Sequence, residues 1–490
     1  MKAKPLHMFF QFASNFSLES MIIGISSVAF SLASNPDKDF NMFASIMPYK
    51  VVYGGRVYDD SVRVYQTNLI DVLHDIINGR SFGIKNITHD EMLFLIHLHV
   101  NLEGERHTRE KSDTQFWLGF FGSMGEQKKF QEKQNFLDEF SRERYILEVV
   151  SKKTHIKNSN VINCYDEFVK ETSLTPKIYS SILFVLFVHF IQLSPIITPK
   201  TLKSELKNPE LSNERICNML QKYSISIESL KSGNIDRQQF YLTPFIKIGE
   251  TYVSSNPILT LMTFVNSNYW VIKNAFKERG VHDFPIEFGK YFEMYFEEIL
   301  ENCFPRGQYK NIEESDKGKR ADWHICIGEY HFLIEQKSAV SNIKIKQTHS
   351  DVESMKTHIT RNWGKAVKQL SETEKALGLT KAIKIILVYE DFYNCECLSK
   401  LFEIATSLTN DNYYWLVSIK DFEILAHTYK TDQNLFFKII SEKIHAEETQ
   451  SNEGRDLTKF FAENGIKRNE YLNEFGISKY FEDIEKFVLE

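Results

Sequence analysis

Three side chains suited to metal-assisted hydrolysis lie close together in the stretch RADWHICIGEYHFLIEQKS, residues 320–338: Asp322, Glu335 and Lys337. Two carboxylates that meet repel each other unless a proton or a cation lies between them. Their oxygens suit a hard ion, Mg²⁺ or Mn²⁺, to which the backbone carbonyl of Gln336 could add another oxygen. Lys337 could orient or deprotonate a metal-bound water, or stabilise charge on a phosphate.

A β-hairpin would bring these side chains together. Residues 323–327 and 330–334 are rich in aromatic and β-branched residues, and the Gly-Glu pair between them (328–329) is typical of a two-residue turn. Pairing across this turn places Asp322 opposite Glu335, with Cβ atoms about 5 Å apart. The sequence therefore predicts that the two carboxylates converge.

The alternation of side chains along a strand predicts which residues share the site. Glu335 and Lys337 point to one face, whereas Ile334 and Gln336 point to the other. The alternative is a surface hairpin with a cross-strand salt bridge, because a D-x12-E-x-K string also arises by chance.

The surrounding segments predict helices and strands that would frame this ribbon. A helix over 285–300 has an apolar stripe with Glu293 at its edge, where Glu293 either reaches the site or is solvated. Downstream, the patterns predict two more helices and two strands buried on both faces, in the order helix 358–377, strand 381–390, helix 398–408, strand 413–419.

This order, with G-x-x-F-E at 289–293, Asp322 and E-x-K at 335–337, resembles the PD-(D/E)XK nuclease superfamily over roughly residues 282–428. The resemblance implies a restriction-endonuclease-like fold and Mg²⁺-dependent hydrolysis of phosphodiesters in DNA or, less often, RNA. It makes Asp322 and Glu335 metal ligands, Lys337 the catalytic lysine and Glu293 a supporting glutamate. Ala321 stands where many members have proline, a position that varies across the superfamily.

Many members of this superfamily also supply a Gln or Lys to the site from the helix after E-x-K. The candidates here are Lys365, Lys368 and Gln369, which could equally form a polar helix face.

A basic patch starts where the proposed site ends. The whole chain has 59 Lys plus Arg against 65 Asp plus Glu, a formal net charge of -6, which argues against a generic nucleic-acid binder. Between Lys337 and Gln369, however, basic residues outnumber acidic ones, and such a patch attracts a phosphate backbone unless it is an ordinary solvated surface. The candidate nucleic-acid-binding residues are Lys344, Lys346, Arg361, Lys365 and Lys368.

The remaining sequence predicts an α+β or α/β protein in four parts. These are a mainly helical region with a regulatory or partner-binding role (1–240), a hairpin with a connecting helix (241–281), the nuclease-like mixed sheet flanked by helices (282–430) and a short helical tail (431–490). The apolar run 178–197 is interrupted by polar residues and fits a buried helix better than a membrane span. We expect no membrane association and, from six scattered cysteines and no secretion signal, a cytoplasmic location.

The sequence thus predicts a metal-dependent endonuclease, with DNA favoured over RNA as the substrate and defence against phage or foreign DNA as the context. By analogy with this fold, we expect a homodimer or a complex with a partner subunit. The alternative is a nuclease-derived module that binds nucleic acid, or serves as a structural subunit of a larger complex, without cutting.

Overall fold

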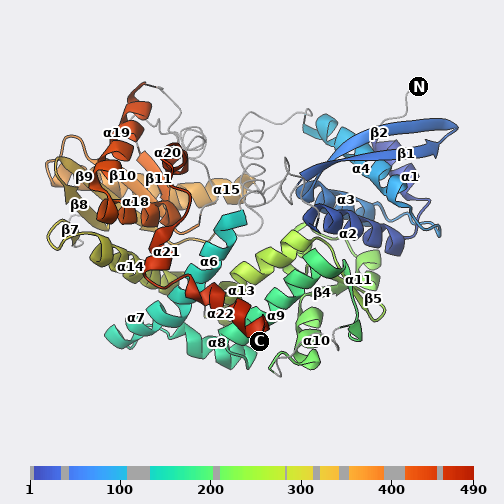
Figure 1. Cartoon of the computed structure of the whole chain (residues 1–490), viewed down its shortest axis with the longest axis horizontal. Helices are drawn as coiled ribbons and strands as arrows, with labels where there is room; N and C mark the ends of the chain where they lie inside the picture. Colours follow the sequence, from blue (N-terminus) through green and yellow to red (C-terminus); the bar gives the residue numbers. More distant parts are fainter. Residues whose placement is uncertain are drawn as a thin grey trace.

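The computed structural model combines helices with small sheets (Figure 1). It describes residues 5–34, 44–107, 133–201, 210–281, 284–312, 320–340, 352–390, 414–449 and 456–489. Lys344, Lys346 and the helix expected at 398–408 lie outside the described residues.

The N-terminal module packs helices against a long β-hairpin. Its elements are α1 (Pro5–Ala13), α2 (Leu18–Ser34), β1 (Ala44–Tyr53), β2 (Arg56–Tyr65), α3 (Gln66–Gly79) and α4 (His89–His107). The turn between the strands is Gly54-Gly55, and both glycines have positive φ (56° and 75°), which a turn of this kind requires. A mainly helical region was expected here from the sequence, and this hairpin was not predicted.

A second sheet joins the N-terminal module to the middle of the chain. Its strand order is β3 (Ile196–Ile197), β6 (Thr251–Ser254), β5 (Phe245–Ile248) and β4 (Ser224–Ser226). The hairpin expected in 241–257 is confirmed as β5 and β6, with Gly249 at φ 60° in the turn. The long helix expected after it is confirmed as α13 (Pro257–Glu278), which begins with Pro257 and an Asn256 side chain that accepts the N–H of Ile258.

The middle of the chain is helical apart from the short strands of this sheet. Its elements are α6 (Lys133–Tyr145), the π-helical turn η1 (Ile146–Val150), α7 (Ser151–Lys157), α8 (Cys164–Thr172), α9 (Pro176–Val188), the π-helical turn η2 (His189–Leu193), α10 (Asn213–Lys222), α11 (Ile227–Ser232) and α12 (Gln238–Leu242).

One described segment, Pro176–Leu193, is long and apolar enough to cross a membrane by length and composition, and half of it is buried inside the protein. It comprises α9 and η2. Ile182 and Phe190 are fully buried in the largest hydrophobic cluster, and the imidazole of His189 bonds to the carbonyl of Ile196 at 3.0 Å. These contacts agree with the buried core helix expected from the sequence.

The mixed sheet of the C-terminal half carries the predicted site. Helix α14 (Phe284–Cys303) precedes it, and the strands run in the order β11 (Tyr414–Ser418), β10 (Ile383–Val388), β9 (Tyr330–Lys337), β8 (Trp323–Ile327) and β7 (Tyr309–Asn311). β10 is parallel to β9 and β11, whereas β8 is antiparallel to β9 and β7. Between β9 and β10 the chain forms α15 (Val352–Ile359), the π-helical turn η4 (Thr360–Gly364) and α16 (Lys365–Ala376).

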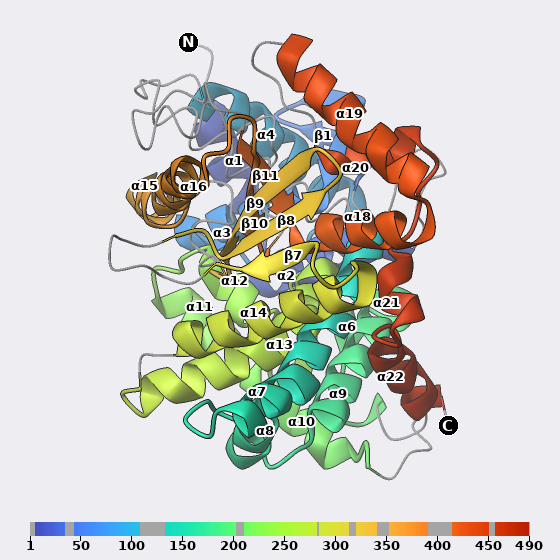
Figure 2. The ribbon, with the colours of Figure 1, turned by 90° about the vertical axis from the view of Figure 1, so that its left-hand side faces the viewer.

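Helices cover the two faces of this sheet (Figure 2). Phe296 of α14 packs edge-on against Trp323 on one face, at 5.9 Å between ring centroids. On the other face, Trp363 and Leu370 pack with Leu333 in a separate cluster. After β11 come α18 (Ile419–Thr431), α19 (Gln433–Thr449), α20 (Leu457–Glu463), α21 (Glu470–Glu474) and α22 (Lys479–Leu489).

The largest hydrophobic cluster does not stop at the boundaries expected from the sequence. It runs from Phe136 in α6, through α13, α14 and the sheet, to Ile484 in α22. Helix α22 packs against α6 and α9. The helical middle and the sheet therefore share one core, while a second cluster joins the N-terminal module to residues 227–259.

Candidate active site

The hairpin of β8 and β9 has the predicted register. Ile327 pairs with Tyr330 and Trp323 with Ile334, so the same count places Asp322 opposite Glu335. Gly328 in the turn has φ 59°, a value that glycine adopts without strain. The local pattern of apolar strands around a Gly-x turn therefore fixes which acidic residues meet.

Asp322 binds the backbone of the opposite strand. The N–H of Gln336 donates to Oδ2 of Asp322 at 2.6 Å, and the N–H of Asp322 donates to the carbonyl of Ile334 at 3.0 Å. The first bond ties the Asp322 carboxylate to the residue directly after Glu335. Asp322 is thereby held beside the second predicted ligand.

The carboxyl group of Glu335 is buried, and only one of its two oxygens has a hydrogen-bond partner among the described residues. It is 3 % exposed; its Oε1 accepts a 2.5 Å hydrogen bond from Nζ of Lys337, and its Oε2 has no hydrogen-bond partner among the described residues. Burial, reinforced by the charge of Asp322, raises the pKa of Glu335 to about 8, although Lys337 and the Gln369 amide act in the opposite direction. A buried carboxyl group beside a second acidic residue favours either a proton or a cation.

Lys337 lies on the same face as Glu335, as predicted, and is 17 % exposed on its side chain. Gln336 points to the other face, where Nε1 of Trp323 donates to its Oε1 at 2.9 Å. The backbone of Gln336 therefore borders the acidic pair and its side chain does not, and the role of its carbonyl as an ion ligand stays a prediction.

Helix α16 holds the chain that leads into Asp322. Nε2 of Gln369 donates to the carbonyl of Arg320 at 3.0 Å, and the N–H of Ala321 donates to Oγ1 of Thr373 at 2.8 Å. Gln369, one of three candidates on this helix, thus lies beside Glu335 and also positions the approach to Asp322. Thr373 was not identified from the sequence, although its spacing of four residues from Gln369 puts both on one helix face.

Glu293 has other neighbours. Nδ2 of Asn311 in β7 donates to its Oε1 at 3.4 Å, and burial together with the charge of Glu297 raises its pKa. Asn311 pairs with Trp323, which faces α14, whereas Glu335 faces α16. The structure therefore does not bring Glu293 to the acidic pair. Helix α14 does approach this end of the sheet at Gly289, where a Cβ would lie 3.3 Å from Oγ of Ser338.

The basic candidate residues that the structure describes lie on the helical segment formed by η4 and α16, which also carries Gln369. Arg361, Lys365 and Lys368 are exposed, in η4 and α16. The ammonium of Lys368 lies 4.0 Å from the carboxylate of Glu372, but the Lys368 side chain is 78 % exposed. The ion pair is therefore weak, and Lys368 can still interact with another anion. The spacing of four and three residues places all three on one side of the helix that also carries Gln369.

Two histidines that were not singled out from the sequence lie further along the same hairpin. Nε2 of His324 and Nδ1 of His331 are 3.0 Å apart, and their rings stack. Burial, helped by His331 and Lys310, lowers the pKa of His324. Alternation along the strands gives them the same face as Asp322 and Glu335.

The fit to a divalent ion depends on the two carboxylates. Within the described part of the chain, no three His, Cys, Asp or Glu side chains are placed so that they could hold a metal ion. Mg²⁺ commonly binds through one or two carboxylates and keeps several waters, so a pair of acidic residues such as Asp322 and Glu335 is compatible in kind with that ion. The unpartnered Oε2 of Glu335 agrees with such a ligand.

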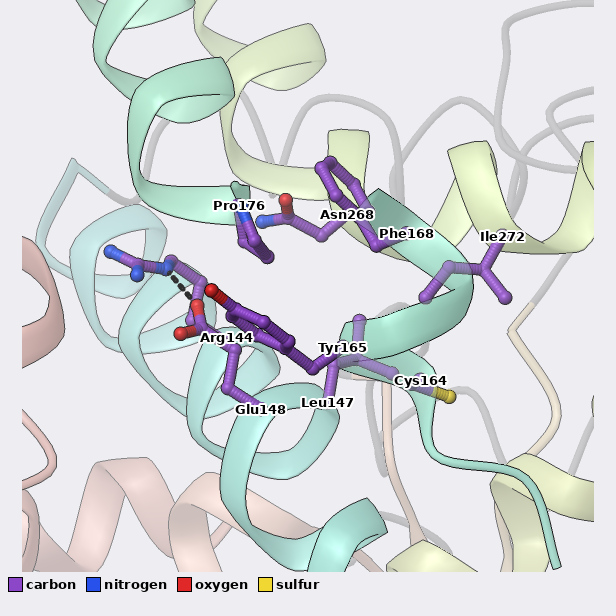
Figure 3. Close-up of a pocket in the computed structure, with 9 residues that line it drawn as sticks. All are labelled: Arg144, Leu147, Glu148, Cys164, Tyr165, Phe168, Pro176, Asn268 and Ile272. Atoms are coloured by element: carbon purple, nitrogen blue, oxygen red, sulfur yellow. Dashed lines mark hydrogen bonds and ion pairs between the residues drawn. The ribbon is translucent and has the colours of Figure 1, made fainter. Parts of the chain in front are cut away.

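Two hollows of the structure lie elsewhere. One lies among Arg144, Glu148, Cys164, Asn268 and neighbouring residues (Figure 3), and its space accessible to water is about 10 Å³, room for about one water molecule. Another is a surface groove between α7 and α14, lined by Lys153, Lys157 and three glutamates. Neither contains residues of the acidic pair.

Comparisons of the chain with family models, with curated proteins and with solved structures gave no match.

Proposed function

We propose that this chain is a metal-dependent nuclease that hydrolyses phosphodiester bonds in nucleic acid. One observation carries the proposal: Glu335 is buried beside Asp322, with one carboxylate oxygen unpartnered and its pKa raised to about 8. A structural salt bridge would leave neither feature, because its carboxylate would be fully paired and its pKa lowered.

Asp322 and Glu335 would hold one Mg²⁺ or Mn²⁺, with the Gln336 carbonyl as a further oxygen. The ion supplies positive charge against the phosphate and lowers the pKa of bound water. Lys337 is the residue in position to orient the attacking water or to stabilise charge on the phosphate, since its ammonium lies 2.5 Å from Glu335. Gln369 keeps Glu335 and the approach to Asp322 in place.

The strand order supports the proposed restriction-endonuclease-like fold. The chain forms a helix, then three antiparallel strands, then a helical segment and a parallel strand, which is the order that the PD-(D/E)XK resemblance implies. The acidic residues lie on β9 and just before β8. Within this proposal the helices before the sheet regulate the nuclease or bind a partner.

The proposed substrate is DNA, with RNA as the other candidate, because both present the same phosphodiester to the ion. The exposed stripe of Arg361, Lys365 and Lys368 supports binding of a phosphate backbone next to the acidic pair. The proposed setting is the cytoplasm, where a nuclease of this kind would act against phage or foreign DNA.

The deciding experiment is cleavage of plasmid, linear, single-stranded and RNA substrates with Mg²⁺, with Mn²⁺ and with chelator. We expect metal-dependent cutting by the wild-type chain and its loss in Asp322→Ala and in Lys337→Ala. Glu329→Gln, in the exposed turn of the same hairpin, is the matched control and should cut normally. Cutting that survives both site substitutions, or no cutting with any substrate, would overturn the proposal.

A further inference from the structure

Thr373 in α16 joins this helix to the backbone directly before Asp322. Its Oγ1 accepts the N–H of Ala321 at 2.8 Å, and its own proton goes to the carbonyl of Gln369, one turn earlier in the helix, at 2.7 Å. A threonine hydroxyl has one proton to donate, so this second bond leaves its lone pairs for Ala321. Thr373 is 1 % exposed and Ala321 is 0 % exposed, so solvent does not compete for the bond between them.

Gln369 and Thr373 together hold a single peptide group. The carbonyl of Arg320 accepts from Nε2 of Gln369 at 3.0 Å, and the N–H of Ala321 is the other polar group of the same peptide unit. Because both of its polar groups are bonded to α16, the plane of this peptide group is fixed against the helix. The two side chains are four residues apart and therefore lie on one face of α16.

The next two peptide groups are held by the sheet. The N–H of Asp322 donates to the carbonyl of Ile334 in β9 at 3.0 Å, and the carbonyl of Asp322 accepts from the N–H of Ile312 at 2.9 Å. Asp322 lies in a bend just before β8 begins at Trp323. Helix α16 therefore anchors the entry to this bend, and the sheet anchors Asp322 itself. The direction of the Asp322 carboxylate depends on both.

We propose that Thr373 is a positioning residue for Asp322, which its hydroxyl holds, through the peptide group of residues 320 and 321, in the orientation that a shared ion requires. The inference rests on the proposed metal site. Gln369 cannot report this role alone, because its amide also acts on Glu335. Among the described residues, the side chain of Thr373 bonds only to Ala321 and to its own helix, so a change there acts on the Asp322 side of the site.

Mn²⁺ affinity, measured by calorimetry without nucleic acid, tests this role independently of cleavage. Thr373→Val keeps the size and branching of the side chain but leaves the buried N–H of Ala321 without its acceptor. We expect Mn²⁺ to bind about 10–100-fold more weakly, the usual cost of removing a support behind a metal ligand. Thr373→Ser restores the hydroxyl and should bind Mn²⁺ as the wild type does.

Hydrogen exchange in the metal-free protein tests the bond itself, by mass spectrometry on fragments that contain residues 320–323. An amide exchanges when its hydrogen bond opens, so Thr373→Val should exchange faster there than the wild type and Thr373→Ser. Thr428→Val in α18 is the matched control, since it removes the same kind of bond, from a buried threonine to the carbonyl four residues earlier at 2.8 Å. It should leave both Mn²⁺ affinity and the exchange of residues 320–323 unchanged.

Cleavage kinetics separate positioning from substrate binding. For Thr373→Val we expect a lower kcat with the KM for nucleic acid unchanged, because the exposed basic residues of η4 and α16 are intact. Wild-type Mn²⁺ affinity in Thr373→Val, or a Thr373→Ser variant as weak as Thr373→Val, would overturn the inference while the nuclease proposal stands. A wild-type chain that binds no Mn²⁺ would overturn the proposed function and this inference with it.

Discussion

The guanidinium of Arg142 in α6 forms a bidentate ion pair with the carboxylate of Glu423 in α18. Its Nε and Nη2 donate to the two carboxylate oxygens at 2.5 and 2.6 Å. The two side chains are 2 % and 0 % exposed. Tyr295 of α14 donates to the same carboxylate at 2.6 Å, and Asn469 donates to it at 2.5 Å. One buried ion pair thus joins the helical middle, the helix before the sheet and the C-terminal helices.

Removing one partner of this ion pair should destabilise the whole protein. Glu423→Gln leaves Arg142 charged and buried, which costs about 3–5 kcal/mol in the free energy of unfolding. Urea titration measures the change, with Lys438→Ala, which removes a mostly exposed pair to Glu442, as the control expected to stay within about 0.5 kcal/mol. Because the largest hydrophobic cluster spans both the helical middle and the mixed sheet, we expect these two regions to unfold in one transition. Two transitions in the wild-type chain would contradict a shared core.

Binding of Mg²⁺ or Mn²⁺ should release a proton. The pKa of Glu335 is about 8, so below that pH an ion must displace the proton of this carboxyl. We expect affinity to fall about tenfold for each pH unit below 8. Calorimetry in two buffers of different ionisation enthalpy measures the protons released, about one per ion. Glu335→Gln should abolish binding, and affinity that does not change with pH would rule out Glu335 as a ligand.

Without metal, the protein should lose stability as pH rises from about 5 to 8. The folded chain retains a proton on Glu335 that the unfolded chain releases near the ordinary glutamate pKa of 4.5, so the unfolded state gains relative to the folded state across this window. The loss is at most about 1.4 kcal/mol per pH unit. Urea titrations of wild type and Glu335→Gln at several pH values isolate this contribution. A Glu335→Gln slope equal to that of wild type would refute it.

The basic stripe should set the salt dependence of nucleic-acid binding. Substituting Arg361, Lys365 or Lys368 by alanine should weaken binding similarly for all sequences and reduce the slope of log K against log salt by about 1 for each phosphate that is no longer neutralised. Fluorescence anisotropy on catalytically impaired Lys337→Ala protein measures this without cleavage. Lys277→Ala, an exposed lysine on α13, is the matched control. An unchanged slope in all three variants would place nucleic acid elsewhere.

Gln369 should act as a positioning residue. Gln369→Leu removes the bond to the Arg320 carbonyl and the amide beside Glu335, so we expect a 10–100-fold loss of metal affinity or activity, about the cost of removing such supports. The pH at which Glu335 releases its proton should also rise, because the amide lowers that pKa. Unchanged metal affinity together with an unchanged pH profile would show that Gln369 only packs.

The hairpin that carries Asp322 and Glu335 could be predicted because neighbouring residues in the sequence determine it. A Gly-x turn and two apolar runs fix the register, and the register alone puts Asp322 opposite Glu335. The same reasoning identified β5 and β6. The Gly54-Gly55 turn carries an equally strong signal, yet its hairpin was not predicted, because the flanking strands contain the charged residues of a half-exposed hairpin and Pro48.

Other features of the structure depend on packing between segments that are far apart in the sequence. A short sequence pattern carries no information about that packing. The depth at which Glu335 is buried follows from α16 and β10 closing over it, not from residues 335–337 alone. Glu293 has the helical spacing expected of a supporting glutamate, but α14 lies on the opposite face of the sheet. The pairing of Arg142 with Glu423 joins positions 281 residues apart.

The shared core also has a temporal consequence during synthesis of the chain. The helices α6 and α9 emerge from the ribosome long before α22, which packs on both of them, and Arg142 is made well before its counter-charge. The contacts of α6 and α9 with α22, and the ion pair of Arg142, therefore form only after the C-terminal helices have been translated. A chain released before α22 would lack the helix that packs on both α6 and α9.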